Sequence, residues 1–249
     1  LHGSDILLFK MSEQISQKER LWLLPARTGG LKAGLYLVST PIGNLGDITI
    51  RGLDVLAGCD QVICEDTRVS GKLLAHFGIK KPLLPYNDHN AERQRITVLK
   101  MLREGKRVAF ISDAGTPLIS DPGYKLVRAC LEEGIHVTSL PGANAVLTAL
   151  QLSGLPGDSF SFLGFLPPKQ TARKKFLEKW RDVESTLIAF ETAPRLSDSL
   201  KNIEEVLGDR EIAVLRELTK LYEEGRRGAT SELIAYYEEH GAPKGEIVL

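Results

Sequence analysis

Residues 110–123 read FISDAGTPLISDPG, and this stretch decides the predicted fold. The β-branched and apolar residues 107–112 are long enough for one buried strand. That strand ends in an acidic turn at Asp113, and the glycine in this turn lets the backbone approach another molecule closely. Residues 121–123 then resemble an N-cap with proline at the first helical position, which predicts a helix from about Tyr124. A strand, a tight acidic loop and a helix are typical of the ligand-binding edge of an open α/β sheet.

The same alternation of strand and helix extends over residues 34–153. Strands are expected at 35–40, 61–65, 82–86, 107–112 and 136–140, and helices at 49–59, 69–77, 91–104, 124–133 and 143–152. Strands that alternate with helices of about ten residues predict a largely parallel sheet covered on both faces. We therefore expect an N-terminal α/β domain at 34–153.

A second, smaller α/β domain with a mixed sheet is predicted at 158–249. The stretch 154–158 (GLPGD) is the expected boundary, because its glycines and proline cannot continue a helix. Strands are expected at 159–164, 185–190, 211–215, 221–226 and 245–249, and helices at 170–181, 194–207 and 231–240. The last strand stops at Leu249, which indicates an end that has been truncated.

The first 33 residues form a separate segment, expected to be a flexible arm. Residues 1–10 precede Met11, so they are either upstream sequence or residues added for expression, and they are left out of the fold prediction. The segment has no long apolar region followed by a small-residue cleavage site. The expected location is therefore the cytoplasm.

Composition narrows the possible classes of protein. The chain has 249 residues, 43% of them hydrophobic, which is enough to bury a substantial core. The 32 basic and 32 acidic residues balance, which argues against a protein that coats nucleic acid non-specifically. No run of eighteen apolar residues is present, so no membrane span is expected.

The metal-binding residue types are scattered. Cys59, Cys64 and Cys130 lie among apolar residues without CxxC spacing, which favours reduced, mostly buried thiols. The five histidines show no metal-ligand spacing. We therefore predict no structural or catalytic metal.

Two further strand-end loops also carry acidic residues. The loop at 39–47 (STPIGNLGD) has only two glycines, so it is not a GxGxxG fingerprint, and Asp47 could simply cap the next helix. The next loop carries Glu65, Asp66 and Arg68, which could orient a hydroxyl group and take its proton. The alternative is a helix start in which Asp66 or Thr67 caps the helix and Arg68 is solvated.

A further tight turn, 141–145 (PGANA), opens the last helix of the first domain. Four loops thus follow strands at the same edge of a parallel sheet, which favours a binding site over mere architecture. None of them contains the GKS or GKT sequence of a phosphate-binding P-loop. A nucleoside triphosphate held by a P-loop is therefore not expected.

The motifs STPIGNLGDIT, CEDTR, SDAGTPLISDPG and PGANA, in this order and spacing, resemble the ribosomal RNA small subunit methyltransferase I family, a branch of the tetrapyrrole methylase superfamily. The resemblance implies a two-domain S-adenosylmethionine-dependent enzyme with its cofactor in a cleft between the domains. It also implies a homodimer. The implied reaction is methylation of the ribose 2′-hydroxyl of a cytidine in the decoding region of 16S rRNA.

The resemblance also implies roles for individual residues. The candidates for cofactor contact are Pro41, Gly43, Asp113, Gly115, Leu118, Asn144, Ala145 and, from the second domain, Thr192. A 2′-hydroxyl is a poor nucleophile until it loses its proton, so a nearby base is expected. By their position in the strand-end loops, the candidate carboxylates are Asp47, Glu65 and Asp66, and Arg68 could instead hold a phosphate.

An RNA substrate requires positive charge, and residues 169–181 supply a concentration of it. The candidate RNA contacts are Lys169, Arg173, Lys174 and Lys175. The alternative is an ordinary amphipathic helix with a solvated basic face. The basic residues of 93–107 are more spread out and are interpreted as a helix surface.

Two other functions remain compatible with this sequence. The superfamily architecture also serves methylation of tetrapyrrole carbons, which would need a large apolar cavity and no basic rim. A non-enzymatic RNA-binding or assembly factor could keep the same fold without turnover.

Overall fold

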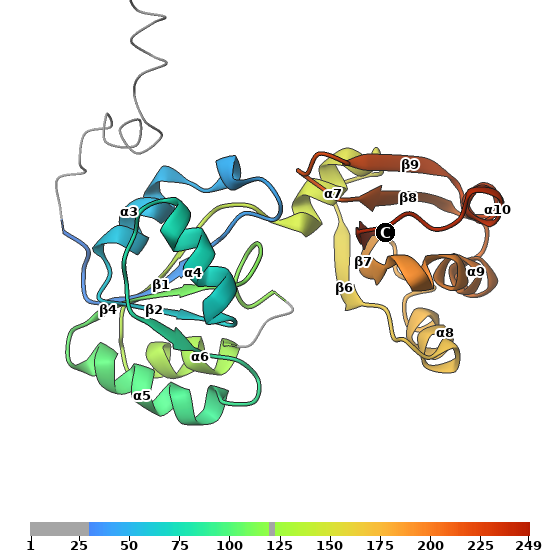
Figure 1. Cartoon of the computed structure of the whole chain (residues 1–249). Coiled ribbons are helices and arrows are strands. Elements are labelled where there is room, and N and C mark those ends of the chain that lie inside the picture. The colour runs from blue at the N-terminus through green and yellow to red at the C-terminus, as the bar shows by residue number, and fades with distance from the viewer. Residues whose placement is uncertain (1–29, 120–122) are drawn as a thin grey trace, which may run out of the picture. The chain divides into compact units, whose positions relative to one another are not determined.

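The computed structural model describes residues 30–119 and 123–249. Their contacts form two compact units (Figure 1). Unit 1 comprises the described residues up to Thr40 together with Ile48–Gly142, and unit 2 comprises Pro41–Asp47 and Ala143–Leu249. Residues 1–29 of the predicted arm at 1–33 and the predicted helix cap at Asp121 lie outside the described residues.

Unit 1 contains the predicted parallel sheet, with strand order β3-β2-β4-β1-β5. Its strands are β1 (Gly34–Val38), β2 (Gln61–Cys64), β3 (Leu83–Pro85), β4 (Arg107–Ile111) and β5 (Val137–Leu140). All of their pairings are parallel, and Leu37 of β1 lies opposite Phe110 of β4. The expectation of a largely parallel first sheet is confirmed.

Helices cover both faces of this sheet, as Figure 1 shows. They are α3 (Ile50–Gly58), α4 (Thr67–His76), α5 (Ala91–Arg103) and α6 (Tyr124–Glu132). Alternate residues of β1 face opposite sides, because side chains along a strand have a period of two. Leu35 packs with residues of α5 and α6, whereas Tyr36 packs with residues of α3 and α4.

The helix starts correct one prediction and confirm another. Asp47 is not the cap of α3, because Thr49 holds that position and its hydroxyl accepts a hydrogen bond from the Gly52 amide at 3.0 Å. Asp47 instead ends the short 3₁₀ helix η2 (Leu45–Asp47). Asp66 caps α4, as the alternative interpretation of that loop predicted.

The three cysteines are buried and unpaired, as their scattered positions predicted. Burial raises the pKa of Cys130 to about 11, and it also raises the pKa values of Cys59 and Cys64. Because the thiolate is the reactive form, these side chains behave as small apolar core residues.

Unit 2 is built on a mixed sheet with strand order β6-β7-β10-β8-β9. Its strands are β6 (Phe160–Phe165), β7 (Thr186–Thr192), β8 (Glu211–Arg216), β9 (Glu224–Ala229) and β10 (Glu246–Val248). Only the pairing of β6 with β7 is parallel. The strand expected at 221–226 begins later, at Glu224, because a turn occupies the residues before it.

The helices of unit 2 are α7 (Ala145–Ser153), α8 (Gln170–Glu178), α9 (Leu196–Leu207) and α10 (Thr230–His240), with the 3₁₀ helix η3 (Ala193–Arg195) before α9. The first of them, α7, was expected in the N-terminal domain. Its Val146 and Ala149 instead pack with Ile188 and Ala213 of unit 2. The contacts therefore divide the chain at Gly142, ahead of the glycine- and proline-rich stretch 154–158.

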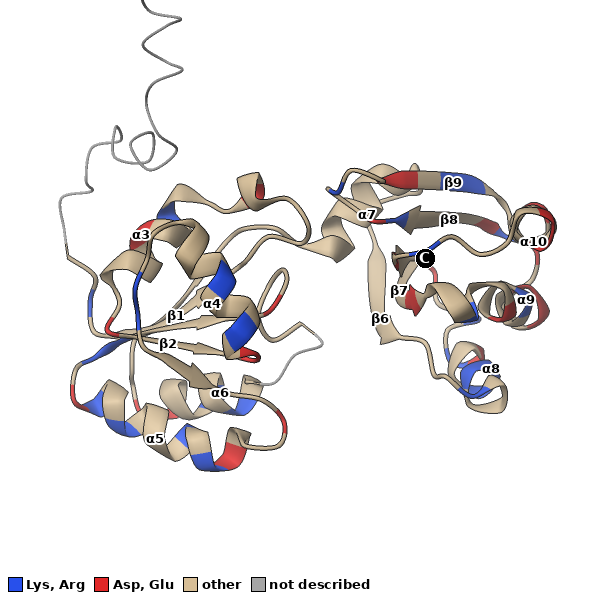
Figure 2. Ribbon diagram, viewed as in Figure 1, with Lys and Arg blue, Asp and Glu red and all other residues tan. Residues whose placement is uncertain are grey.

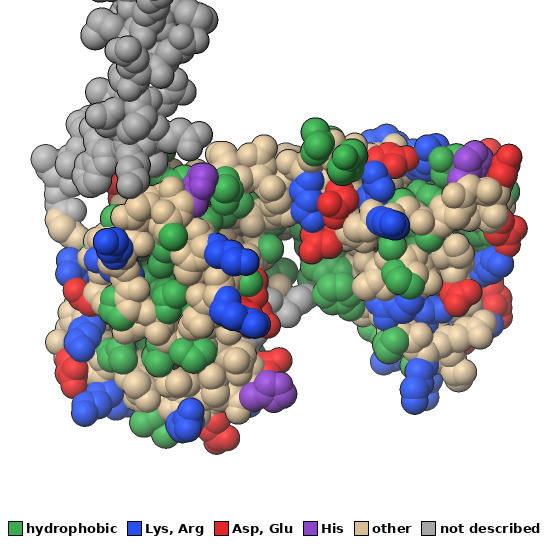
Figure 3. Space-filling view, viewed as in Figure 1, with side chains coloured by type: hydrophobic (Ala, Val, Ile, Leu, Met, Phe, Trp, Pro, Cys, Tyr) green, Lys and Arg blue, Asp and Glu red, His purple; other side chains and the backbone are tan. Residues whose placement is uncertain are grey.

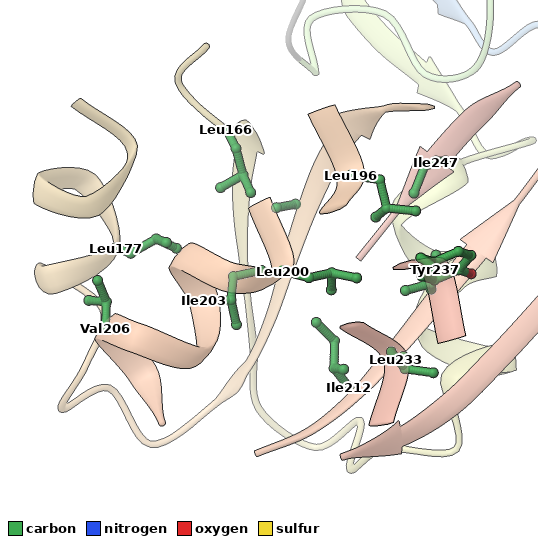
Figure 4. Packing of buried hydrophobic residues seen from close by; sticks show 12 residues of the cluster. Leu166, Leu177, Leu196, Leu200, Ile203, Val206, Ile212, Leu233, Tyr237 and Ile247 are labelled. Carbon is green, nitrogen blue, oxygen red and sulfur yellow. The ribbon is translucent and has the colours of Figure 1, made fainter. Parts of the chain in front are cut away.

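The main core of unit 2 lies between its sheet and α8, α9 and α10. Leu200 of α9 is fully buried and lies near the centre of this cluster (Figure 4). Leu177 of α8, Leu233 of α10 and Ile247 of β10 belong to the same cluster. Four elements thus share one apolar core, and the sheet depends on it for its exact position relative to the helices.

Leu200→Ala should lower the free energy of unfolding by about 2–5 kcal/mol, because it leaves a cavity in this core. Urea denaturation followed by circular dichroism measures the loss. The control is Leu221→Ala, at a side chain that is 88% exposed, and it should change the value by less than about 0.5 kcal/mol. Equal effects of the two substitutions would contradict the assignment of Leu200 to a structural core.

Candidate functional site

The loops after the strands of unit 1 leave from one edge of the sheet, because all of the strands run in parallel. Two backbone hydrogen bonds join the loop after β1 to the loop after β4. The Thr40 amide donates to the Gly115 carbonyl at 2.9 Å, and the Gly115 amide donates to the Thr40 carbonyl at 3.0 Å. The Thr40 hydroxyl also donates to the Ser112 carbonyl at 3.0 Å. The predicted meeting of these loops at one edge is therefore present in unit 1.

The loop after β4 takes an unusual backbone conformation. Gly115 has φ +79°, and Leu118 has φ +74°, which side chains rarely adopt. The Ser112 hydroxyl donates to the Gly115 carbonyl at 2.9 Å and helps to hold the turn. A non-glycine residue at positive φ stores strain of the kind that is found at binding sites.

The loop after β5 is held against the loop after β1. The Ser39 hydroxyl lies 3.3 Å from the Leu140 carbonyl and 3.3 Å from the Thr116 hydroxyl. A Cβ atom on Gly142 would come within 2.7 Å of the Ser39 Cβ atom, so only glycine fits there. Three strand-end loops are thus fastened together by hydroxyls and tight backbone contacts.

Asp66 and Arg68 form a local pair at the start of α4. The Asp66 carboxylate accepts the Arg68 amide at 2.8 Å, and the Arg68 guanidinium lies 2.6 Å from the same carboxylate. The hydrogen bond from the Arg68 side chain is the main reason that the pKa of Asp66 falls to about 2. Asp66 therefore stays ionised and makes a weak proton acceptor at neutral pH.

Glu65 and Asp113 have the opposite electrostatic environment. Partial burial raises the pKa of both carboxyls, and the negative charge of Asp113 adds to the effect on Glu65. Asp113 also accepts the Asp66 amide at 3.2 Å, which links the loops after β2 and β4. Both carboxyls line an open hollow of about 410 Å³, together with Asp66, Thr67, Pro85, Asn87 and His89.

The other predicted cofactor residues belong to unit 2. Asn144 caps α7, where its side-chain oxygen accepts the Leu147 amide at 3.0 Å, and Ala145 is the first residue of that helix. Pro41 and Gly43 lie in the segment Pro41–Asp47, which is anchored by Ile42 in the core of unit 2.

Thr192 is exposed and is part of a network that the sequence did not reveal. Its hydroxyl accepts the Arg195 Nε hydrogen at 3.0 Å. Arg195 in turn lies 2.5 Å from the buried carboxylate of Glu191, which also accepts hydrogen bonds from Ser199 and from the Thr192 amide. Because side chains along a strand have a period of two, the apolar Ala189 could have indicated that Glu191 is buried on the same face, but not which partners it has.

The basic helix α8 contributes fewer surface cations than predicted, although its ribbon carries several lysine and arginine positions (Figure 2) and basic side chains gather at its surface (Figure 3). Arg173 is only 2% exposed, and its Nε donates to Asn202 at 2.9 Å, so it supports the fold and is not available to RNA. Lys174 pairs with Glu205 at 2.5 Å. Lys169 and Lys175 are exposed.

Neither a metal centre nor a membrane-spanning helix is found in residues 30–119 and 123–249. No group of three or more His, Cys, Asp or Glu side chains there is placed to hold a metal ion. No helix in the same part of the chain is long and apolar enough to cross a membrane.

The sequence of residues 34–234 matches the family described as Tetrapyrrole (Corrin/Porphyrin) Methylases. A protein of Erythrobacter litoralis named Ribosomal RNA small subunit methyltransferase I is 55% identical over 219 residues, which cover 88% of this chain and 77% of that protein. A protein of Mesorhizobium japonicum with the same name is 50% identical over 227 residues, which cover 91% of this chain and 76% of that protein.

Solved structures share the fold at much lower identity. A uroporphyrin-III-C-methyltransferase from Thermus thermophilus matches with a TM-score of 0.60 and 22% identity, over 87% of this chain and 93% of its own. A diphthine synthase matches with a TM-score of 0.65 and 15% identity, over 86% of this chain and 88% of its own. These likenesses establish the architecture.

The two neighbouring carboxyls should respond to amidation in opposite directions. Glu65→Gln should raise the melting temperature at pH 7, because it removes a charge whose pKa is raised above 4.5 in the folded state. Asp66→Asn should lower it, because the pKa of Asp66 is depressed from 3.8 to about 2 and its ionised form favours folding.

Thermal melts from pH 3 to pH 8 measure both effects. The gain from Glu65→Gln should disappear as the pH falls below 4.5, where that carboxyl is protonated in both the folded and the unfolded state. The loss from Asp66→Asn should persist above 3.8 and shrink as the pH falls toward 2. Shifts of the same sign for both variants at pH 7 would refute this electrostatic description.

Proposed function

The chain belongs to the tetrapyrrole methylase family of S-adenosylmethionine-dependent methyltransferases, and we propose that it methylates ribosomal RNA of the small subunit. The finer proposal is that the acceptor is the ribose 2′-hydroxyl of a cytidine in the decoding region of 16S rRNA. The observation that carries the proposal is the set of fastened loops at one sheet edge, with Glu65 and Asp113 at an open hollow. The names of relatives that share about half of their residues with this chain support the same substrate class.

The chemistry of the loops fits S-adenosylmethionine. That molecule carries a positive sulfonium, an adenine with hydrogen-bonding edges and a zwitterionic tail, so it needs backbone amides, carbonyls and a carboxylate. Gly115 adds no side chain to the loop after β4, and Asp113 supplies the carboxylate. The residues that would hold the cofactor are Pro41, Gly43, Asp113, Gly115, Leu118, Asn144, Ala145 and Thr192. When bound, it supplies a methyl group on a good leaving group.

Among the candidate bases, Glu65 is the best suited to take a proton from a hydroxyl. Its pKa is raised and its side chain is exposed at the hollow, so it can reach an acceptor and bind the proton. Asp66 is held ionised by Arg68 and by its role as a helix cap. We therefore assign the proton transfer to the Glu65 carboxylate, and we assign to Arg68 the binding of a phosphate of the RNA. Asp47 stays the second candidate for the base.

The polar lining of the hollow argues against a tetrapyrrole substrate. Its lining includes Glu65, Asp66, His89 and Asp113, whereas a porphyrin-like substrate requires a large apolar cavity. The resemblance of the sequence motifs supports two further proposals, a homodimer and a cytoplasmic location.

The proposed reaction predicts transfer of methyl label from S-adenosylmethionine to small-subunit RNA at a single nucleotide. Alkaline hydrolysis should leave the labelled linkage intact, because a 2′-O-methyl group blocks internal attack on the phosphate. Glu65→Gln should lower kcat by about 10²–10⁴-fold without weakening cofactor binding, since it removes only the proton acceptor. Glu104→Gln, on the surface after α5, is the matched control.

Each alternative gives a different result in this experiment. Cofactor binding without label transfer would identify a non-enzymatic factor and overturn the proposed reaction. Label in a tetrapyrrole, or in an alkali-sensitive RNA linkage, would overturn the proposed acceptor. Unchanged kcat in Glu65→Gln would remove this carboxylate from the mechanism.

Lys169 and Lys175 should contact RNA phosphates if α8 faces the substrate. The double variant Lys169→Ala/Lys175→Ala should weaken RNA binding and reduce the slope of log K against log salt by about 1 for each phosphate that is no longer neutralised. Arg93→Ala/Lys100→Ala on α5 is the matched control, because it removes the same charge from an exposed helix face of unit 1. Filter binding over a salt series measures both, and identical slopes for the two variants would place the RNA elsewhere.

A further inference from the structure

The turn between β8 and β9 is held in a strained conformation. Glu217 has φ +49° and Thr219 has φ +67°, and neither is glycine. The Lys220 amide donates to the Glu217 carbonyl at 3.0 Å, and the Thr219 amide donates to the Glu223 carboxylate at 2.6 Å. Such a conformation persists only where its surroundings impose it, so the contacts of unit 2 hold this turn in place.

The Lys220 ammonium bridges two carboxylates. Its Nζ atom lies 2.9 Å from Glu217 Oε1 and 2.8 Å from Glu246 Oε2. The Glu246 amide also donates to Glu217 Oε1 at 2.9 Å, so β10 and the turn share the same carboxylate. Burial of the ammonium opposes its charge, yet the bonds to Glu246 and Glu217 raise the pKa of Lys220 overall. We call Glu217, Lys220 and Glu246 the lysine bridge.

The stem of Lys220 packs directly against the backbone of Gly43. A Cβ atom on Gly43 would overlap Lys220 Cγ, and it would lie 3.0 Å from both Lys220 Cε and Thr219 Oγ1. Gly43 is not among the glycines at positive φ, so an alanine there would be hindered by this contact and not by backbone strain. Because Lys220 is held at both ends of its side chain, it cannot swing away without breaking the lysine bridge.

The rest of the segment Pro41–Asp47 rests on the same part of unit 2. Ile42 is 9% exposed and belongs to one apolar cluster with Leu218, which is 6% exposed. Leu218 of the β8–β9 turn and Ile42 thus share one core, while the aliphatic part of the Lys220 side chain covers Gly43. Ile42 and Gly43 therefore both rest on the β8–β9 turn.

We propose that Lys220 is a positioning residue for the methyl donor. The lysine bridge fixes the aliphatic part of the Lys220 side chain, and this side chain holds Gly43 and Pro41 in the conformation that binds the cofactor. This inference rests on the proposed function, since it takes Pro41 and Gly43 as cofactor contacts. In this role Lys220 acts through the loop that contains Gly43.

A double-mutant cycle at Gly43 and Lys220 tests this role, with calorimetric titration of S-adenosylmethionine into the full chain. Gly43→Ala should weaken binding by about tenfold or more, because the new methyl group forces the loop off the lysine stem. Adding Lys220→Ala should recover part of that affinity, since it removes the Cγ and Cε atoms that the methyl group meets, while Thr219 Oγ1 remains. Lys220→Ala alone should weaken binding less than Gly43→Ala does.

Further variants separate positioning from general stability. Lys220→Met keeps the aliphatic part of the side chain and removes the charge. It therefore tests whether the position of Gly43 depends on the ion pairs of the lysine bridge or on the aliphatic part alone. Lys201→Ala, which breaks the pair with Glu238 on the same unit, is the control and should leave cofactor affinity unchanged. The Lys220 variants should raise the KM for the cofactor while the KM for RNA stays constant, at temperatures well below their melting transitions.

The outcomes distinguish this inference from the function on which it rests. Wild-type protein that binds no S-adenosylmethionine would overturn both. Wild-type binding, with Gly43→Ala equally tight or with no recovery in the double variant, would overturn the role of Lys220 alone. Recovery in the double variant together with an unchanged KM for RNA would establish it.

Discussion

The reciprocal hydrogen bonds between Thr40 and Gly115 are the constraint on which the arrangement of the site in unit 1 depends. A parallel sheet brings its loops to one edge, but it does not by itself keep them together. The two bonds fix the loop after β1 to the loop after β4, and Gly115 can accept this pairing because it adopts φ +79°. The Ser39 hydroxyl then adds the loop after β5.

The adjacent carboxylates Glu65 and Asp66 differ in the direction of their pKa shifts because their neighbours differ. Asp66 points at the start of α4 and at Arg68, and both partners stabilise its charge. Glu65 has Asp113 and Asp66 as neighbours, and their negative charges add to the effect of partial burial. Two groups of nearly equal intrinsic acidity are thereby separated into one that remains ionised and one that can accept a proton.

The local patterns of the sequence predicted the order of elements well, because strands that alternate with helices leave a clear periodicity. They did not predict which unit α7 joins, since Val146 and Ala149 would be apolar against either sheet. They also placed Arg173 on the surface, because a basic residue in a basic stretch gives no sign of the Asn202 side chain that accompanies its burial. The strand β9 was expected too early, because Leu221 and Tyr222 look like strand residues but belong to an exposed turn. Partners that are distant in sequence decided the cases of α7 and Arg173, whereas a local turn delays the start of β9.

The segment Pro41–Asp47 is a local sequence motif that contacts residues far away in the sequence. It directly follows Thr40, which is bound to Gly115, and its backbone at Gly43 is covered by Lys220, which lies far along the chain. The motif STPIGNLGD therefore specifies a glycine-containing connection, and the side chain that lies against Gly43 is held by ion pairs of Lys220 with Glu217 and Glu246. Because charged pairs and close glycine contacts both tolerate little displacement, a substitution in the β8–β9 turn should be transmitted to Gly43 without altering any residue of the motif itself.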